Sequence, residues 1–281
     1  MTASIQAHRD FYANYIVRKA GSKDERLVAA FSSVPREHYV GPGPWKVSTG
    51  PEYLLTVGDE PYLLYQDVLI GLSTERGINN GEPSLHARCL AAVAPVAGES
   101  VIHIGAGTGY YSAILAQLVA PGGNIVAYEI EADLAARAKA NLKAMAGIEV
   151  VAASAVGVTL SSADVIYVNA GATHPVDTWL DALNIGGRLI FPLTPDKGLG
   201  CMLLIKRRGA SEYDANVVAR VGFIPCIGAR DEAASKSLAM ALERQPVTSV
   251  RSLRRDSQPD DSAWCVGNGW WISTEPTSPT V

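Results

Sequence analysis

The sequence predicts an α/β protein built around a doubly wound, Rossmann-like sheet of parallel strands. From about residue 100 onward, short apolar segments alternate with segments of helical period. Such alternation is typical of a parallel sheet covered by helices on both faces. A glycine-rich turn, Gly105-Ala-Gly107-Thr-Gly109, stands between the first apolar segment and the helix that follows it. A strand, a glycine turn and a helix in this order form the usual layout for binding a nucleotide-like ligand.

The segment before this alternation has a different pattern, and we expect it to form a helical and irregular lobe over residues 1–75. Residues 5–20 are predicted to be a helix. The spacing from Ser22 to Glu25 is that of a capping box, which predicts the start of a second helix over residues 24–34.

The rest of this lobe is expected to contain little regular structure. Residues 36–62 are rich in glycine and proline and predict an irregular segment. The apolar residues 65–72 are consistent with a strand, and residues 73–83 with a polar loop. Pro83 suits the first turn of a helix that continues over residues 84–94.

The alternating part is expected to be a cofactor-binding domain over residues 76–210, followed by an extension over residues 211–281 packed on it. Strands are predicted at 100–104, 124–129, 148–152, 164–168, 187–193 and 201–206, and helices at 110–119, 131–146 and 176–183. The extension is expected to add a strand at 216–224 and a helix at 231–244. It carries three of the five tryptophans, Trp264, Trp270 and Trp271. These side chains are expected either to seal the extension onto the domain or to line an acceptor pocket.

Composition excludes several classes of protein. The net charge of -4, from 24 basic and 28 acidic residues, gives no overall cationic attraction to nucleic acid. The four cysteines are far apart and form no CxxC pair, so neither a zinc site nor a disulfide framework is expected. No signal sequence and no membrane-spanning apolar window is apparent. We therefore expect a cytoplasmic protein without a bound metal, a membrane partner or a nucleic-acid partner.

The glycine turn distinguishes between two classes of cofactor. Dinucleotide sites favour GxGxxG, whereas this turn has the compact GxGxG form with Tyr110 in the place of the last glycine. The compact form suits S-adenosylmethionine, which has no pyrophosphate. Glu129 ends the second strand, 24 residues after Gly105, where a carboxylate can bind ribose hydroxyls.

Over about residues 10–207 the chain resembles the protein-L-isoaspartate O-methyltransferase family. The similar segments are DERLVAAFSSVPREHYV at 24–40, AYEIEADLAARAKANL at 127–142, and ADVIYVNAGATHPVDTWLDALNIGGRLIFPL at 163–193. The resemblance implies a Rossmann-like methyltransferase fold with S-adenosylmethionine as cofactor. It also implies methylation of the carboxylate of isoaspartyl residues in damaged peptides, which is a protein-repair reaction.

The resemblance also implies which residues would contact the cofactor. In this sequence they are Gly105, Ala106, Gly107, Gly109, Tyr110, Glu129, Ile130, Ser154 and Ala155. His86 stands at a cofactor-side position of the family. His103 stands two residues before the first glycine, where the family has an acidic residue, and it is either a ligand contact or a satisfied core residue. Ser154 stands where the family has an acidic residue beside the adenine.

The acceptor loop departs from the family pattern. The family has T-I-S-x-P, with the serine hydroxyl near the reacting carboxylate, whereas this chain has Asn79-Asn80-Gly81-Glu82-Pro83. The tract from Asn79 to Gly81 is most simply a tight turn. Gly81, Glu82 and Ser84 are the candidates for acceptor-side residues. Glu82 is expected either to cap the following helix or, if it points inward, to disfavour a carboxylate acceptor.

Three functions therefore remain open on the sequence alone. The first is the family reaction on isoaspartyl peptides, which needs no general base because a carboxylate is already ionised at neutral pH. The second is methyl transfer to another carboxylate or small molecule. The third is a cofactor-binding protein without catalysis. The sequence predicts no oligomeric state.

Overall fold

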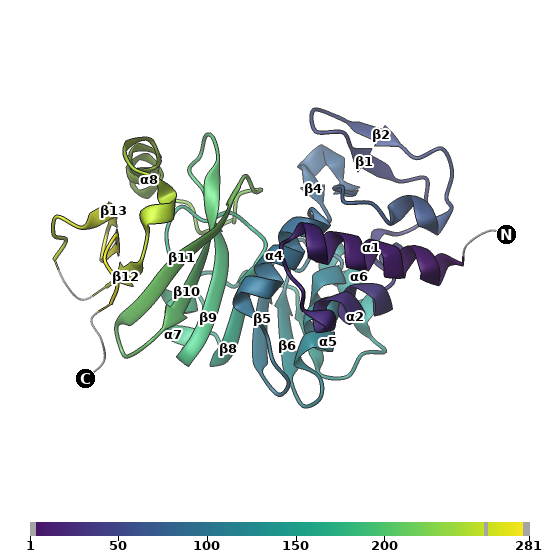
Figure 1. Ribbon diagram of the computed structural model, residues 1–281, viewed down its shortest axis with the longest axis horizontal. Helices are drawn as coiled ribbons and strands as arrows, with labels where there is room; N and C mark the ends of the chain where they lie inside the picture. The colour runs from purple at the N-terminus through teal and green to yellow at the C-terminus, as the bar shows by residue number, and fades with distance from the viewer. Residues whose placement is uncertain (1–3, 256–257, 278–281) are drawn as a thin grey trace. The chain divides into compact units, whose positions relative to one another are not determined.

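The computed structural model describes residues 4–255 and 258–277, and within them the chain forms two compact units (Figure 1). The first unit contains the described residues up to Gly98 together with Ala106–Ala153. The second unit contains Glu99–Gly105 and the described residues from Ser154 onward. The predicted division at residues 75 and 210 stays a prediction.

The first unit begins with two helices, as predicted, drawn in purple in Figure 1. Helix α1 is Ile5–Lys19 and helix α2 is Glu25–Ser33. The predicted capping box at Ser22 is wrong, because the side chain of Asp24 caps α2 by accepting the N–H of Arg26. The Ser22 hydroxyl instead accepts the N–H of Asp24 at 3.1 Å.

The segment that follows α2 contains short elements rather than one irregular loop. They are α3 Glu37–Val40, β1 Lys46–Ser48, β2 Tyr53–Leu55, η1 Pro61–Leu64, β3 Gly71–Ser73, η2 Thr74–Arg76 and β4 Ile78–Asn79. Strands β1 and β2 form one antiparallel hairpin, and β3 and β4 form another.

The strand predicted over residues 65–72 is wrong except at its last two residues. The physical reason is the fully buried Arg36. Its guanidinium donates hydrogen bonds to the carbonyls of Leu64 at 2.9 Å, Gln66 at 3.0 Å and Val68 at 2.7 Å. A charged side chain therefore satisfies backbone carbonyls that a neighbouring strand would otherwise satisfy.

Helix α4, Pro83–Val93, begins at the predicted proline, but its first turn is capped from a distant part of the chain. The carboxylate of Asp67 accepts the N–H of Ser84 at 2.7 Å, and it also pairs with the Lys19 ammonium of α1 at 2.7 Å. Asp67 therefore joins α1 and α4 through one buried carboxylate.

The remaining elements of the first unit match the predicted β/α alternation. They are α5 Tyr110–Val119, β6 Asn124–Tyr128, α6 Ala132–Leu142 and β7 Ile148–Val151. Strands β6 and β7 are parallel, as predicted. Helix α6 ends four residues before the predicted end at 146.

The second unit is built on a mixed sheet. Its elements are β5 Ser100–Ile104, β8 Ala163–Val168, α7 Asp177–Ala182, β9 Leu183–Leu193, β10 Gly200–Arg207, β11 Glu212–Val221, α8 Glu232–Arg244, η3 Val247–Ser249, β12 Ser252–Arg254, β13 Ala263–Gly267 and β14 Trp270–Ser273. In this unit the strand order is β13-β14-β12-β11-β10-β9-β8-β5. Strands β5, β8 and β9 are parallel neighbours, whereas every pairing from β9 to β13 is antiparallel.

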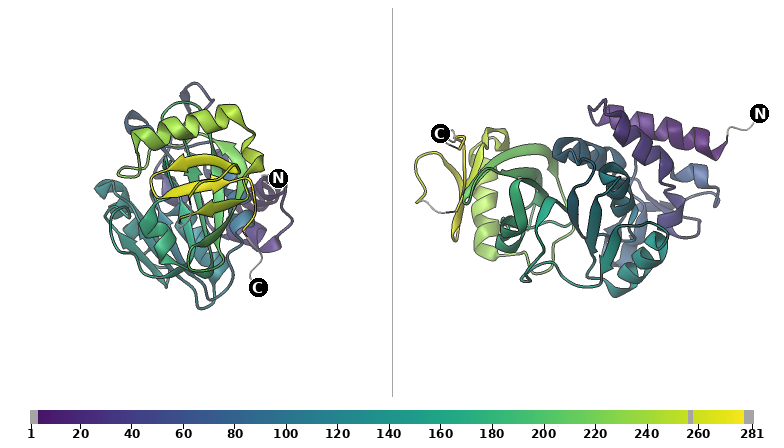
Figure 2. Two further views of the ribbon diagram at one scale, coloured as in Figure 1. Left: turned by 90° about the vertical axis from the view of Figure 1, so that its left-hand side faces the viewer. Right: turned by 90° about the horizontal axis from the view of Figure 1, so that it is seen from below.

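The C-terminal extension therefore continues the sheet of the second unit. Helix α8 lies alongside the last strands, which are yellow in the left view of Figure 2. The hydroxyl of Ser237 on α8 donates to the carbonyl of Val266 at 2.7 Å, and Arg244 donates to the carbonyls of Ala263 and Trp264. These bonds cover the free edge of β13, which would otherwise expose unpaired backbone groups.

The three tryptophans of the extension are buried within this unit, in β13 and β14. Trp271 packs under the guanidinium of Arg254, whose central carbon lies 5.4 Å from the ring centroid. No helix among residues 4–255 and 258–277 combines the length and the hydrophobicity that crossing a bilayer requires.

Replacing Asp67 tests the capping of α4. Asp67→Ala is expected to lower the free energy of unfolding by about 1–3 kcal/mol, because it leaves the Ser84 N–H and the Lys19 ammonium without their partner. Urea denaturation at neutral pH measures the loss. Asp261→Ala, at an exposed aspartate, is the control and should change stability little.

The difference in stability between wild type and Asp67→Ala is expected to depend on pH. Burial raises the pKa of Asp67, but the hydrogen bonds from Lys19 and Ser84 outweigh burial and hold the pKa below its ordinary value. The stabilisation is therefore present above the ordinary aspartate pKa and is lost as the pH falls through the lowered folded-state pKa. A stability difference between wild type and Asp67→Ala that persists unchanged into strong acid would contradict this assignment.

Candidate functional site

The glycine turn after β5 adopts the conformation that its composition predicts. Gly105, Gly107 and Gly109 all have positive φ, at +75°, +56° and +95°. At Gly109 a Cβ would lie 2.7 Å from Cδ1 of Leu142 on α6, so this glycine also permits close helix packing. At Gly107 the nearest atom to such a Cβ is Cδ1 of Leu72, at 3.8 Å, so the backbone there is open to a close neighbour.

Glu129, at the end of β6, points its carboxylate at this turn. Oε2 accepts the N–H of Gly107 at 2.6 Å, and Oε1 accepts the N–H of Glu131 at 2.9 Å. The residue is only 6% exposed. Burial raises the pKa of Glu129 above its ordinary value, even though the two N–H groups favour the charged form.

The other candidates of the first unit lie around the turn and the end of β6. Ala106 is buried, and its N–H donates to the carbonyl of Tyr128 at 3.1 Å. Tyr110 is buried at the start of α5, and burial raises the pKa of its hydroxyl. Ile130, next to Glu129, is 43% exposed. An exposed apolar side chain beside a buried carboxylate suits contact with the flat face of a ligand ring.

The candidates of the second unit have partners inside that unit. His103 is fully buried on β5, and burial lowers its pKa to about 3. Its Nε2 lies 2.8 Å from Nδ2 of Asn169, at the end of β8. The imidazole is therefore neutral at physiological pH and accepts a hydrogen bond, so it provides no positive charge. Asn169 was not among the residues predicted from the sequence, although a position directly after a buried strand is a signal for a site residue.

Ser154 and Ala155 follow the first unit in the chain and begin the second. The Ser154 hydroxyl accepts the N–H of Val156 at 3.1 Å, which forms a local turn. Ala155 is buried, and its carbonyl accepts the indole N–H of Trp179 at 2.9 Å.

Gly81 in the acceptor loop leaves no room for a side chain. Its φ is +70°, and a Cβ at this position would lie 2.3 Å from Nε2 of His86. The N–H of Gly81 donates to the side-chain oxygen of Asn79 at 2.9 Å, which confirms the predicted tight turn. The His86 ring is held in place by stacking on Tyr111, with ring centroids 3.7 Å apart.

Glu82 is exposed, and its side chain makes no capping hydrogen bond to α4. The interpretation of Glu82 as a capping side chain is therefore wrong, because Asp67 occupies that role. Oε1 of Glu82 instead accepts the hydroxyl of the buried Ser84 at 3.1 Å. Asn80, in the same loop, is 6% exposed, and its Nδ2 is buried without a hydrogen-bond partner.

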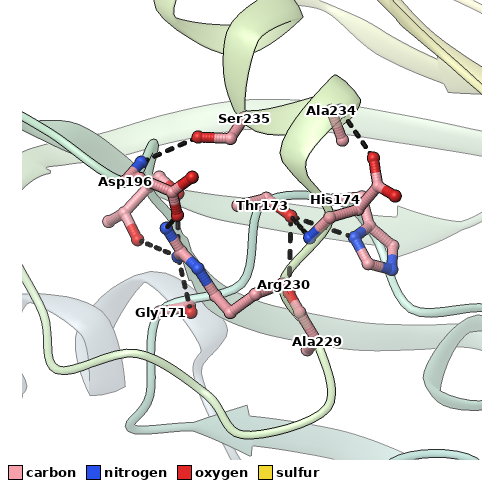
Figure 3. A network of polar contacts seen from close by, with 10 residues as sticks. Gly171, Thr173, His174, Asp196, Ala229, Arg230, Ala234 and Ser235 are labelled. Carbon is pink, nitrogen blue, oxygen red and sulfur yellow. Dashed lines mark hydrogen bonds and ion pairs between the residues drawn. The ribbon is translucent and has the colours of Figure 1, made fainter.

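The loop that follows β8 is fixed by Arg230 (Figure 3). The guanidinium donates to the carbonyls of Gly171 at 2.9 Å and Thr194 at 3.0 Å, and it pairs with Asp196. The hydroxyl of Thr173 accepts the N–H of Asp231 at 2.8 Å. These bonds anchor the loop to the segment before α8.

Helix α7 begins without a side-chain cap. The N-cap residue is Val176, and it makes no side-chain capping bond. Nδ1 of His174 contacts the hydroxyl of Thr173 at 3.2 Å, and Asp177 pairs with Arg255.

Within the described residues, no group of three or more His, Cys, Asp or Glu side chains is arranged to hold a metal ion. The four cysteines are buried and form no disulfide.

Introducing a side chain at position 81 tests the steric description of the loop. Gly81→Ser is expected to lower the free energy of unfolding by roughly 1–2 kcal/mol from the left-handed backbone alone, with a further loss from displacing His86. Chemical denaturation measures the total loss in free energy of unfolding from these two causes. The double variant Gly81→Ser, His86→Ala should be less destabilised than the sum of the two single variants. Additive losses would show that the serine and the ring do not compete for space.

Comparison with known proteins identifies the family. Residues 14–231 match the family described as Protein-L-isoaspartate(D-aspartate) O-methyltransferase. A protein-L-isoaspartate O-methyltransferase of Methanothermobacter thermautotrophicus is 28% identical, over 73% of this chain and 88% of that protein. One of Aeropyrum pernix is 31% identical, over 72% of this chain and 73% of that protein.

Solved structures agree with this assignment. A structure of a protein-L-isoaspartate O-methyltransferase is 26% identical, with a TM-score of 0.65, over 84% of this chain and 68% of that one. A putative Plasmodium falciparum enzyme, solved with S-adenosyl-L-homocysteine, has 18% identity and a TM-score of 0.63, over 78% of this chain and 98% of that one, which shows a shared fold.

The fold class predicted from the sequence, an α/β Rossmann-like methyltransferase, is confirmed. The chain belongs to the protein-L-isoaspartate(D-aspartate) O-methyltransferase family and is a methyltransferase of that family.

Proposed function

We propose that this methyltransferase transfers a methyl group from S-adenosylmethionine to the carboxylate of isoaspartyl residues in proteins or peptides. Family membership assigns the cofactor and the polypeptide class of substrate. The observation that carries the proposal is the buried carboxylate of Glu129, bonded to the Gly107 N–H of a turn that has no Cβ in the way. The domain division, the cytoplasmic location and the absence of nucleic-acid and membrane partners stay predictions.

The residues around the turn fit the cofactor. A carboxylate is the group that binds two ribose hydroxyls, and burial strengthens those hydrogen bonds. The contacts proposed within the first unit come from His86, Ala106, Gly107, Gly109, Tyr110, Glu129 and Ile130. The other expected contacts, His103, Gly105, Ser154 and Ala155, stay predictions. His103 is neutral, since burial holds its pKa at about 3.

Methyl transfer to a carboxylate needs little general acid or general base catalysis. The bound cofactor supplies an activated methyl group on a positively charged sulfur. The acceptor carboxylate is already ionised at neutral pH, so this chain has no proton to remove. Its residues therefore contribute by orienting the two reactants and excluding water. Such positioning is worth up to about 7–11 kcal/mol of the barrier.

The acceptor loop is where this chain differs from its family. Gly81 has no hydroxyl, and the ring of His86 occupies the space that a side chain there would need. The side chain of Glu82 is exposed and accepts the hydroxyl of the buried Ser84, so a carboxylate acceptor is not excluded by repulsion from a buried charge. Because the loop is reshaped, methyl transfer to another carboxylate or small molecule is the second candidate function.

A paired-substrate assay separates the candidates. We expect release of methanol or incorporation of labelled methyl with a peptide that contains isoaspartate, and none with the same peptide containing aspartate. The expected discrimination is at least about 100-fold in kcat/KM, because only one backbone geometry presents the carboxylate correctly. Equal rates, or no transfer to either peptide, would reject the isoaspartyl assignment. If calorimetry shows that S-adenosylhomocysteine still binds in that case, a different acceptor is favoured.

Substituting Glu129 tests the cofactor site directly. Glu129→Ala is expected to weaken S-adenosylhomocysteine binding by about 10–100-fold, since hydrogen bonds to a charged group are lost. Isothermal calorimetry measures the change, with Glu149→Ala on the exposed side of β7 as the control. Unchanged affinity in Glu129→Ala would remove the observation on which the proposed function depends.

The affinity for S-adenosylhomocysteine is also expected to depend on pH. Burial raises the pKa of Glu129, so its carboxylate becomes protonated at a higher pH than an ordinary glutamate does. Wild-type affinity for S-adenosylhomocysteine should therefore weaken as the pH falls toward that raised pKa. Glu129→Gln, which has no titrating group there, should show a flatter profile. Parallel profiles would show that another group is responsible.

A further inference from the structure

The loop that follows β8, residues 169–173, takes its backbone partners from the segment at 224–231. We call the two segments the β8 loop and the extension segment. The N–H of Gly171 donates to the carbonyl of Ile224 at 2.7 Å, and the N–H of Cys226 donates to the carbonyl of Gly171 at 2.9 Å. The β8 loop lies at the carboxyl ends of the parallel strands β5, β8 and β9, where ligands bind in sheets of this kind. The extension segment therefore fixes a loop that stands in a position typical of a site.

Arg230 of the extension segment ties the β8 loop to the end of β9 (Figure 3). Its guanidinium donates to the carbonyl of Gly171 at 2.9 Å, and to the carbonyl and the hydroxyl of Thr194 at 3.0 and 3.1 Å. It also pairs with Asp196. A Cβ at Gly171 would lie 2.4 Å from Oγ1 of Thr194, so the two segments are in close contact. Because a guanidinium presents its donors in a rigid planar fork, this one side chain holds three segments in fixed relative positions.

The first residue of the β8 loop contacts the start of the glycine turn. The N–H of Asn169 donates to the carbonyl of Ile104 at 2.8 Å, and Nδ2 of Asn169 lies 2.8 Å from Nε2 of His103. A Cβ at Gly105 would lie 3.5 Å from the carbonyl carbon of Asn169, so the loop packs against this glycine. Gly105 and His103 are both expected cofactor contacts. A shift of the β8 loop therefore moves two of these contacts, all within the second unit.

We infer that Arg230 is a positioning residue for the cofactor, because it fixes the β8 loop and, through Asn169, the positions of His103 and Gly105. The inference rests on the proposed function in placing the cofactor at the glycine turn, and it is independent of the methyl acceptor. Arg230 acts through the loop rather than by contact with a reactant. Groups that are held rigidly bind a ligand more tightly, since less conformational entropy is lost on binding. The extension segment thereby contributes to cofactor affinity as well as to the sheet.

The test measures the affinity of full-length variants for S-adenosylhomocysteine by calorimetry, at a temperature where circular dichroism shows each variant to be folded. Arg230→Ala is expected to weaken binding by on the order of 10-fold, because the β8 loop loses its anchor. Arg230→Lys is expected to recover part of that loss, since an ammonium can still donate to the carbonyls but lacks the fork of the guanidinium. Wild-type affinity in Arg230→Ala would overturn the inference.

Arg208→Ala is the matched control. Arg208 is an exposed arginine that also pairs with an aspartate, Asp214. It directly follows β10, which runs antiparallel to β9, so it lies at the opposite end of the strands from the β8 loop. Its affinity should equal that of wild type. A loss in Arg208→Ala as large as that in Arg230→Ala would overturn the inference, because the effect would then belong to any arginine–aspartate pair of this unit.

A spectroscopic measurement distinguishes positioning from a general loss of stability. The imidazole ¹⁵N resonances of His103, assigned with His103→Gln, report the hydrogen bond to Asn169 in the absence of ligand. They should shift in folded Arg230→Ala and stay unchanged in Arg208→Ala. If Arg230→Ala does not fold, Arg230→Lys decides the matter. Wild-type affinity together with unshifted His103 resonances in that variant would overturn the inference.

The results also separate this inference from the proposed function. A wild type that binds S-adenosylhomocysteine, with Arg230→Ala equally tight, overturns the role of Arg230 alone. A wild type that does not bind it overturns both the cofactor site and the role of Arg230. Weakened binding and shifted His103 resonances in Arg230→Ala support the inference, even where the isoaspartyl peptide receives no methyl group and the proposed acceptor is rejected.

Discussion

The hydrogen bond from the Gly107 N–H to the Glu129 carboxylate is the interaction on which the proposed cofactor site depends. It joins the glycine turn to the end of β6 at 2.6 Å. The same carboxylate accepts the N–H of Glu131, just before α6 begins. Three separate pieces of the first unit, the turn, a strand end and a helix start, are therefore oriented by one buried charge. Such a charge is stable in the interior only because backbone N–H groups surround it.

A second constraint comes from two buried side chains that organise the acceptor loop from a distance. Arg36 binds the carbonyls of Leu64, Gln66 and Val68, and Asp67 in the same segment caps α4. Because α4 begins directly after the loop, the position of the loop follows from these contacts. Ion pairs also hold the β3–β4 hairpin that precedes the loop, since Arg76 pairs with Glu131 and Asp133 near the start of α6. The proposed acceptor loop is thus held at both ends by ion pairs and carbonyl contacts, in addition to the Gly81–Asn79 hydrogen bond within it.

The loop around position 81 packs closely without a side chain there. Glycine at position 81 allows a left-handed turn, and the ring of His86 packs into the space beside it. The loop is therefore well packed as it stands.

The sequence by itself determined the β/α alternation, the glycine turn and the acidic residue at Glu129, because each depends on local periodicity or on backbone conformations that glycine favours. It also determined the family, through segments that lie within single strands and helices. Only the tertiary structure decided how residues 64–84 fold, because Arg36 and Asp67 act across long sequence separations that no local pattern records. The same holds for the neutral pair of His103 and Asn169 and for the unsatisfied amide of Asn80. Whether a polar side chain is buried, and whether it finds a partner there, depends on the packing of segments that are distant in sequence.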